Sequence, residues 1–174
     1  MRVDLPAPTF ACGDEDLDDF FAHDAANYQR QLLSVTYLLQ VDGTVAGFFS
    51  LLNDKIQSSE IEVPGTRNRM QRPIPNDKRA QSYPAVKIGR LAIAHQFQGQ
   101  KLGSALLESI LNLFGDNNKT GCRFVTVDAY CNATGFYEKH GFDYLTADDA
   151  DAKTRLMYLD LIRLHGLDAA PGTC

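Results

Sequence analysis

The sequence has few of the features that mark membrane, secreted or metal-binding proteins. No apolar run approaches the roughly 18 residues of a membrane span. The opening stretch, MRVDLPAPTF, lacks the apolar core of a secretory signal. The cysteines, at 12, 122, 131 and 174, include no C-x-x-C pair, so they signal neither a zinc site nor a disulfide framework. We therefore expect a cytoplasmic protein with free thiols, no membrane association and no metal.

An excess of positive charge is also missing. The net charge is −5 and the pI is about 5.3, which gives no whole-protein attraction to nucleic acid or to an anionic membrane. At 174 residues, with 44% hydrophobic and 22% charged residues, the chain has the size and composition of one soluble globular domain. We expect a single domain over 1–174, with a core from about 10 to 161 and a tail over 163–174.

The apolar periodicity predicts strands that alternate with helices. Helices are expected over about 14–33, from 102 to 112 or a little beyond, and over 132–140. Strands are expected over 35–41, 44–53, 85–93, 123–130, from 142 onward, and over 155–161, and Asp42-Gly43 joins the first two as a hairpin. This order predicts an α/β (α+β) fold with a mixed sheet and helices on both of its faces.

The segment over 56–84 differs from the rest, because it carries four prolines and the cluster Arg67, Arg69, Arg72, Lys78 and Arg79. It predicts a loop or a broken short helix. Two interpretations are open. The segment is either a solvated connection or a rim that meets an anionic or bulky substrate.

A short polar loop lies between the strand that ends at Ile93 and the helix that starts near Leu102. Small residues at Gly99, Gly103 and Ser104 let the backbone approach a ligand, and the first helical turn presents free N–H groups to an anion. Lys101 could add a charge. The loop has neither G-x-G-x-x-G nor G-K-[ST] at Walker spacing, which disfavours a dinucleotide fold and a nucleotide triphosphatase. By itself it also fits an ordinary strand-to-helix turn.

A second motif, NATGFYEKHGF over 132–142, follows about thirty residues later. With both motifs in this order, the chain resembles the GCN5-related N-acetyltransferase (GNAT) superfamily from about Phe10 to Leu161. That family carries Q/R-x-x-G-x-G/A, matched by Gln98 and Gly103, and then an asparagine followed by [FY]-Y-x-x-x-G-F, matched from Phe136 to Phe142. Lys101 stands where the family has its middle glycine. The resemblance implies a mostly antiparallel central sheet of six to seven strands, splayed at the cofactor site and flanked by about four helices.

The resemblance also implies roles for individual residues around acetyl-CoA, the expected co-substrate. Main-chain groups of Leu91 and Ile93 would pair with the pantetheine amides as an added strand does, and Asn132 would bind the pantetheine arm. Tyr137 would donate a proton or a hydrogen bond to the departing sulfur, although a packed aromatic beside Phe136 is the alternative. The expected cofactor-binding set is Leu91, Ala92, Ile93, Gln98, Gly99, Gln100, Lys101, Leu102, Gly103, Ser104, Asn132 and Phe136, with Tyr137 catalytic.

The sequence names no general base and no acceptor amine. Asp54 and Asp128 are candidate bases, both more typical of structural carboxylates, and His95 is expected at the surface. A lysine amine with a pKa near 10.4 needs a base, whereas an α-amine near 8 needs much less help.

A narrower resemblance concerns the N-terminal half, through Phe10-x-Cys12-Gly13, Val45–Leu51 and Gly89–Ala92. It resembles a bacterial branch that includes toxins acetylating the α-amine of aminoacyl-tRNA. The basic segment suits tRNA, whereas the charge of −5 does not favour it. The leading expectation is therefore acetylation of some other primary amine. The alternatives are a toxin held silent by a partner protein and a non-catalytic CoA-binding module. An exposed edge near the last strand would allow a homodimer.

Overall fold

The computed structural model describes residues 9–61, 81–115, 118 and 120–165. The chain divides into two compact units, Met1–Asn53 with Ile88–Ile110, and Asp54–Lys87 with Leu111–Cys174. The basic cluster from Arg67 to Arg79 and the tail from 166 onward lie outside the described residues.

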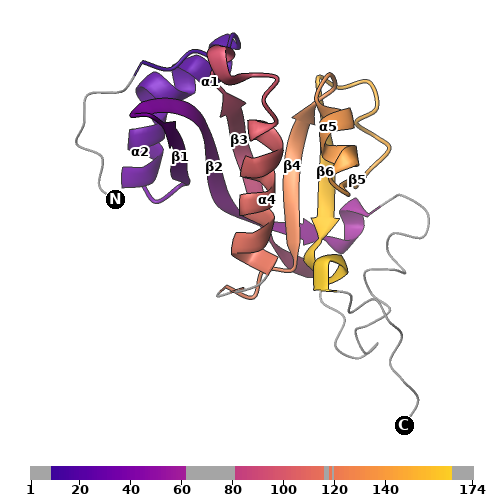
Figure 1. Cartoon of the computed structure of the whole chain (residues 1–174). Coiled ribbons are helices and arrows are strands. Elements are labelled where there is room, and N and C mark those ends of the chain that lie inside the picture. The colour runs from indigo at the N-terminus through magenta and orange to yellow at the C-terminus, as the bar shows by residue number, and fades with distance from the viewer. Residues whose placement is uncertain (1–8, 62–80, 116–117, 119, 166–174) are drawn as a thin grey trace. The chain divides into compact units, whose positions relative to one another are not determined.

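The described strands form one six-stranded sheet in the order β1-β2-β3-β4-β6-β5 (Figure 1). β1 pairs with β2, β4 with β6, and β5 with β6, each antiparallel. The expected mostly antiparallel sheet of six to seven strands is confirmed. The strands are β1 Val35–Val41, β2 Thr44–Gln57, β3 Ser82–Ile93, β4 Phe124–Tyr130, β5 Asp143–Tyr144 and β6 Thr154–Asp160.

The N-terminal helical segment is interrupted where the sequence predicts one helix. α1 (Glu15–Asp19) is followed by a π-helical turn, Phe20–Asp24, and then by α2 (Ala25–Arg30). The Asp14 side chain caps α1 by accepting from the N–H of Leu17 at 3.1 Å. The apolar periodicity does not predict the π turn. One extra residue in the turn still leaves the apolar side chains before and after it on the same face of the helical segment.

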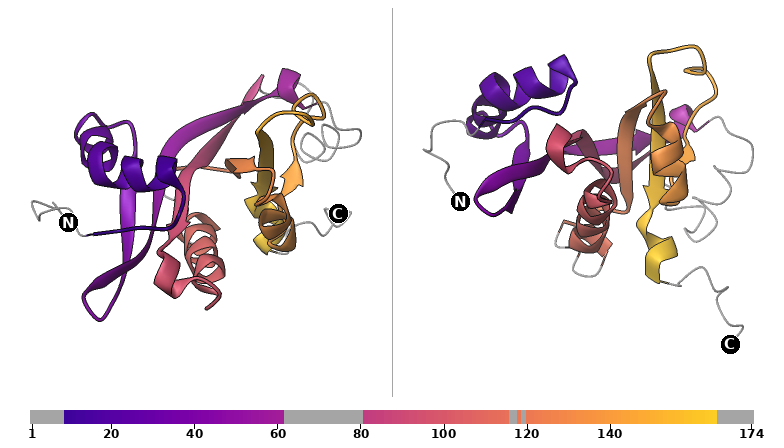
Figure 2. Two further views of the ribbon diagram at one scale, coloured as in Figure 1. Left: turned by 90° about the horizontal axis from the view of Figure 1, so that it is seen from above. Right: turned by 45° about the horizontal axis from the view of Figure 1, so that its top comes forward.

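Helices cover both faces of the sheet in the first unit, as expected. Phe48 of β2 packs with Phe20 and Ala25 from the helical segment. The neighbouring Gly47 faces the other way, where Leu106 of α4 (Leu102–Gly115) lies close. Successive strand residues point to opposite faces, so the N-terminal helices and α4 lie on opposite sides of β2. Figure 2 shows the N-terminal helices beside the β1–β2 hairpin.

The second unit has its own core and a partly buried ion pair. Its core cluster comprises Ile56, Ile61, Tyr83, Ala85, Phe124, Leu145 and Tyr158. Arg123 donates to Asp160 through Nη2 at 2.8 Å and Nε at 3.3 Å, a two-point geometry that fixes the start of β4 to the end of β6. α5 (Thr134–Lys139) is shorter than the predicted 132–140, because Asn132 and Ala133 form the turn that precedes it. Gly141 ends it at φ +86, which confirms the expected glycine stop.

Among the described strands, β1 and β5 lie at the two edges of the sheet. The last strand, β6, is internal, and the edge beside it, β5, has two residues. The expected dimer edge near the last strand is therefore minimal. None of the helices in the described part of the chain is long and apolar enough to cross a membrane.

Candidate active site

The end of β3 and the loop after it form a turn in the first unit that hydrogen bonds connect to two other segments. The N–H of Ala94 donates to the carbonyl of Ala46 on β2 at 2.9 Å, and the N–H of His95 donates to Ala11 at 2.9 Å. A 3₁₀ turn follows at His95–Phe97. The strand end predicted to hold pantetheine is thus bound to β2 on one side and to the N-terminal segment on the other.

Gln98 holds this turn together with its side chain. Its Nε2 donates to the carbonyl of Cys12 at 2.8 Å and to that of Ile93 at 3.0 Å. Both amide hydrogens therefore have acceptors within the protein, and the side chain acts as a brace for the loop. In this structure the side-chain amide of Gln98 fixes the backbone of the loop. The contact of Gln98 with the pyrophosphate stays a prediction.

The N-terminal end of α4 presents the backbone expected of an anion cradle. Gly99 and Lys101 have φ values of +77° and +63°, and the first helical bond runs from the N–H of Ala105 to the carbonyl of Lys101. The N–H groups of residues 102 to 104 therefore precede the helical ladder. Left-handed residues before a helix aim successive N–H groups at one point, which favours a bound anion.

The left-handed backbone at Lys101 explains why the family pattern has glycine there. A residue with a Cβ pays about 1–2 kcal/mol in this conformation. We therefore expect Lys101→Gly to raise the free energy of unfolding by about 1 kcal/mol. Lys101→Ala keeps the Cβ and loses the same charge, so it should leave stability unchanged. Urea denaturation of both variants checks this, and equal midpoints would show that φ +63° carries no strain.

Tyr137 is a buried residue of α5 in the second unit, 7% exposed. Its ring packs edge-on against Phe136 and Phe142, with centroids at 5.1 and 5.4 Å. Its carbonyl accepts from the N–H of Phe142 at 3.1 Å, which ties the helix end to the turn at Gly141. Burial raises the pKa of Tyr137 to about 12, so the phenol keeps its proton at neutral pH. Tyr137 is therefore both a packed aromatic side chain and a phenol that can donate a hydrogen bond.

The other two predicted residues of this segment differ in exposure. Asn132 is exposed in the turn before α5, and Phe136 is partly buried, with its ring 4.7 Å from that of His140. His140 Nδ1 lies 2.8 Å from the carbonyl of Phe136. The exposed amide of Asn132 is accessible to a ligand.

Both candidate carboxylate bases have partners within the second unit. Asp54 accepts a hydrogen bond from the buried Thr126 hydroxyl at 2.6 Å. Asp128 forms an ion pair with Lys87. These partners fit the structural interpretation of both residues. His95 is exposed in the first unit, as expected. Among the described residues, no group of three or more His, Cys, Asp or Glu side chains could hold a metal ion.

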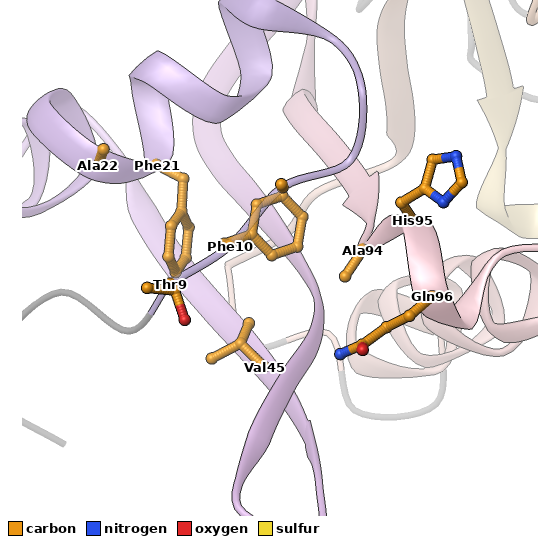
Figure 3. Close-up of a pocket in the computed structure, with 9 residues that line it drawn as sticks. Thr9, Phe10, Phe21, Ala22, Val45, Ala94, His95 and Gln96 are labelled. Carbon is orange, nitrogen blue, oxygen red and sulfur yellow. The ribbon is translucent and has the colours of Figure 1, made fainter.

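A pocket of about 600 Å³ opens beside the loop, and sequence reasoning did not find it (Figure 3). Its apolar wall includes Phe10 and Phe21, whose ring centroids are 4.9 Å apart, and its rim carries His95 and Gln96. The remaining lining residues are Thr9, Ala11, Ala22, Val45 and Ala94. They come from segments far apart in sequence, so no local sequence pattern predicts the pocket.

The predicted site residues are divided between the units. The stretch from Leu91 to Ser104 lies in the first unit, and Asn132, Phe136 and Tyr137 lie in the second. In the first unit the structure brings Ile93 and Gln98 into contact. In the second unit it brings Phe136 and Tyr137 into contact. A site assembled from both groups stays a prediction.

Comparison with known proteins identifies the class. Residues 77–157 match the family described as Acetyltransferase (GNAT) domain. A tRNA-acetylating toxin of Mycobacterium tuberculosis (strain ATCC 25618 / H37Rv) is 28% identical over 142 residues, 80% of each chain. Among solved structures, AtaT complexed with acetyl-methionyl-tRNAfMet is 23% identical with a TM-score of 0.75, covering 92% of this chain and 90% of AtaT. A tyrosine-to-phenylalanine mutant of KacT is also 23% identical, with a TM-score of 0.74 over 91% of this chain and 89% of KacT.

The fold and these matches define an N-acetyltransferase. More particularly, residues 77–157 match a GNAT acetyltransferase domain, and the expected resemblance of the chain to the branch with tRNA-acetylating toxins is confirmed.

Proposed function

We propose that this acetyltransferase transfers the acetyl group of acetyl-CoA to the α-amino group of an aminoacyl-tRNA in the cytoplasm. The observation that carries the proposal is the 28% identity with a tRNA-acetylating toxin over 80% of both chains. The structural neighbours contribute the fold to this argument, and not the substrate.

In the proposed reaction, main-chain groups of Leu91 and Ile93 bind the pantetheine amides, and Asn132 binds the arm farther along. The N–H groups at the start of α4, around Gly103 and Ser104, hold the pyrophosphate. The left-handed residues before that helix support this role. The neutral amine attacks the thioester carbonyl directly, the C–S bond breaks, and Tyr137 donates a hydrogen bond or its proton to the departing sulfur. The proton that the attacking nitrogen loses passes to solvent, and a phenol that has given up its proton regains one from solvent. The raised pKa keeps that phenol protonated at neutral pH, which a hydrogen-bond donor requires.

An α-amine suits a site without a dedicated base. Its pKa of about 7.7–8.0 leaves a substantial neutral fraction at physiological pH, whereas a lysine amine near 10.4 is almost fully protonated. Asp54 and Asp128 are both occupied by internal partners, Thr126 and Lys87. The proposal therefore assigns neither of them to proton removal from the acceptor.

Replacing Asp128 tests this assignment. Asp128→Asn removes the ion pair with Lys87, a pair that is partly exposed and contributes little to stability. We expect kcat to stay within about threefold of wild type, because general-base catalysis would contribute about 100-fold or more. Steady-state acetylation at pH 7 and pH 9 measures it. A loss near 100-fold that high pH rescues would make Asp128 the base and contradict the proposal.

The acidic charge of the protein restricts how tRNA can bind. A net charge of −5 provides no general attraction to RNA, so contacts with phosphates must be local. Few phosphate contacts release few counterions, and affinity should therefore decline only moderately as salt rises.

Acceptor discrimination provides the direct test. The purified chain is incubated with radiolabelled acetyl-CoA and one of three acceptors, which are bulk aminoacyl-tRNA, deacylated tRNA and a panel of primary amines. We expect labelled product from aminoacyl-tRNA alone, released by mild alkaline cleavage of the aminoacyl ester. Transfer to small amines with none to aminoacyl-tRNA would support the second candidate, a different primary amine. CoA binding without transfer to any acceptor would identify a non-catalytic binding module.

A further inference from the structure

Arg90 is a partly buried cation on β3, next to the residues proposed to bind pantetheine. Its side chain is 37% exposed, and its Nε atom is buried without a hydrogen-bond partner. The nearest carboxylate oxygen, on Asp16, lies 3.5 Å from Nε in a geometry that makes no hydrogen bond. Asp16 itself is 60% exposed, and such pairs contribute little to stability. The fold alone therefore does not explain why β3 keeps a charge at this position.

Packing on the N-terminal helical segment fixes the guanidinium and leaves several of its donors unused. The group lies over the ring of Phe20, at 5.1 Å from the ring centre, and Nη1 donates to the carbonyl of Gly89 at 2.9 Å. A guanidinium has one N–H on Nε and two on each Nη atom. The second N–H of Nη1 and both of Nη2 have no acceptor within the described part of the chain. A planar group held in this way is suited to two-point binding of an oxyanion.

Few other cations of the first unit can take this role. Its described residues, 9–53 and 88–110, contain Arg30, Arg90 and Lys101 as their Lys and Arg side chains. Arg30 is exposed in the last turn of α2, and Lys101 lies in the loop proposed for the pyrophosphate. The segment next to Arg90 is acidic, with carboxylates at positions 14, 15, 16, 18 and 19. Since such a surface repels nucleic acid, a phosphate bound here needs a specific cation.

The direction of the cofactor along β3 places Arg90 near the thioester. In the proposed complex the pyrophosphate lies at the start of α4, after the strand, and pantetheine pairs with Ile93 and then with Leu91. Acetyl-CoA runs from pyrophosphate through pantetheine to the thioester, so the thioester lies beyond Leu91, towards Arg90. A strand advances about 3.3 Å per residue, and the Arg90 side chain therefore reaches the space from which the acceptor approaches.

We propose that Arg90 binds the phosphate of the terminal nucleotide of aminoacyl-tRNA and so positions the α-amine at the thioester. This inference rests on the proposed function and adds a residue that holds its acceptor. The terminal phosphate is one ribose away from the aminoacyl ester, which makes it the anionic group of the tRNA closest to the reacting amine. Phosphate contacts fix orientation without reading sequence. Arg90 thus binds and orients the acceptor and takes part in no proton transfer.

Steady-state kinetics with each substrate varied in turn test this role. Arg90→Met keeps an unbranched side chain against Phe20 and removes the charge. We expect kcat/KM for aminoacyl-tRNA to fall about tenfold or more, while KM for acetyl-CoA stays unchanged. Asp16→Asn is the matched control, because it removes the carboxylate beside Nε and keeps the guanidinium. Equal effects of the two variants, or an equal loss towards acetyl-CoA, would reduce Arg90 to a link between α1 and β3 and overturn the proposal.

Salt dependence tests the phosphate contact itself. Each neutralised phosphate contributes about 0.7–0.9 to the slope of log affinity against log salt concentration. Arg90→Met should therefore flatten the slope for kcat/KM with aminoacyl-tRNA by about one. Arg90→Lys keeps the charge and should keep the slope, although it loses the two-point geometry and part of the affinity. A slope that Arg90→Met leaves unchanged would overturn the phosphate contact.

The wild-type reaction separates this inference from the proposed function. A wild-type protein that transfers no acetyl group to aminoacyl-tRNA would remove the proposed function, and the role of Arg90 with it. Wild-type transfer that Arg90→Met leaves intact would remove the role of Arg90 alone, and the proposed function would stand.

Discussion

Tyr137→Phe should lower kcat by about 100-fold or more while leaving the affinity for CoA and the stability of the fold unchanged. The ring packs against Phe136 and Phe142, and phenylalanine keeps those contacts. The hydroxyl alone is lost, and with it the donor proposed for the departing thiolate. Single-turnover acetylation and isothermal titration with CoA separate the two effects. Loss of CoA affinity together with unchanged single-turnover chemistry would make the hydroxyl a binding group only.

The pH profile distinguishes a donor from a base at the same position. With a pKa of about 12, the Tyr137 phenol is neutral throughout the range from about pH 6 to 10, so its ionisation contributes nothing to the profile there. The rising limb should instead follow the acceptor amine, near pH 8 for an α-amine. Tyr137→Phe should therefore lower the whole curve without moving its midpoint. A midpoint that moves would indicate that the tyrosine itself takes up the proton.

The same burial links Tyr137 to stability at high pH. A phenol in the unfolded chain ionises near pH 10, whereas the buried one ionises near 12. The unfolded state therefore releases its proton first, and stability falls as pH rises from about 10 towards 12. Below pH 10 both forms are neutral and the group has no effect.

Much of the fold could be predicted because local signals determined it. Asp42-Gly43 predicted a hairpin turn, and the structure has both residues at positive φ, +49° and +78°. β1 begins and ends where its β-branched pattern does. Pattern alone could not reveal the π turn over Phe20–Asp24, which breaks the period by one residue.

The candidate site was less accessible to sequence reasoning, since its contacts connect distant segments. The motif located the loop and Tyr137, but the brace from Gln98 to Cys12 spans 86 positions and has no local signature. In the motif, Lys101 departs from the family pattern. The backbone at Lys101 nevertheless has the left-handed conformation that glycine adopts most readily. Family spacing predicts which residues meet the cofactor, and the packing decides which of their atoms remain available.

Gly47→Ala should be the most destabilising small substitution near the predicted cofactor strand. A Cβ at Gly47 would lie 2.8 Å from Ile93 Cδ1 and 2.9 Å from the carbonyl oxygen of Ala92. The second contact is with backbone, which cannot rotate away as a side chain can. The φ of Gly47 is outside the left-handed region, so the effect is steric. We expect a loss of about 2–3 kcal/mol in the free energy of unfolding.

Gly135→Ala supplies the matched control and should have the opposite sign. Gly135 lies in α5, and no atom is within 4 Å of its Cβ position. Alanine in a helix is favoured over glycine by about 0.8–1.0 kcal/mol, so this variant should unfold at higher urea. Since the Gly47 clash displaces the residues just before and at Ile93, CoA affinity should fall with stability in that variant. A Gly47→Ala protein with wild-type urea midpoint and wild-type CoA affinity would show that β3 can shift freely, and the strand would then be too mobile to hold the pantetheine amides in place.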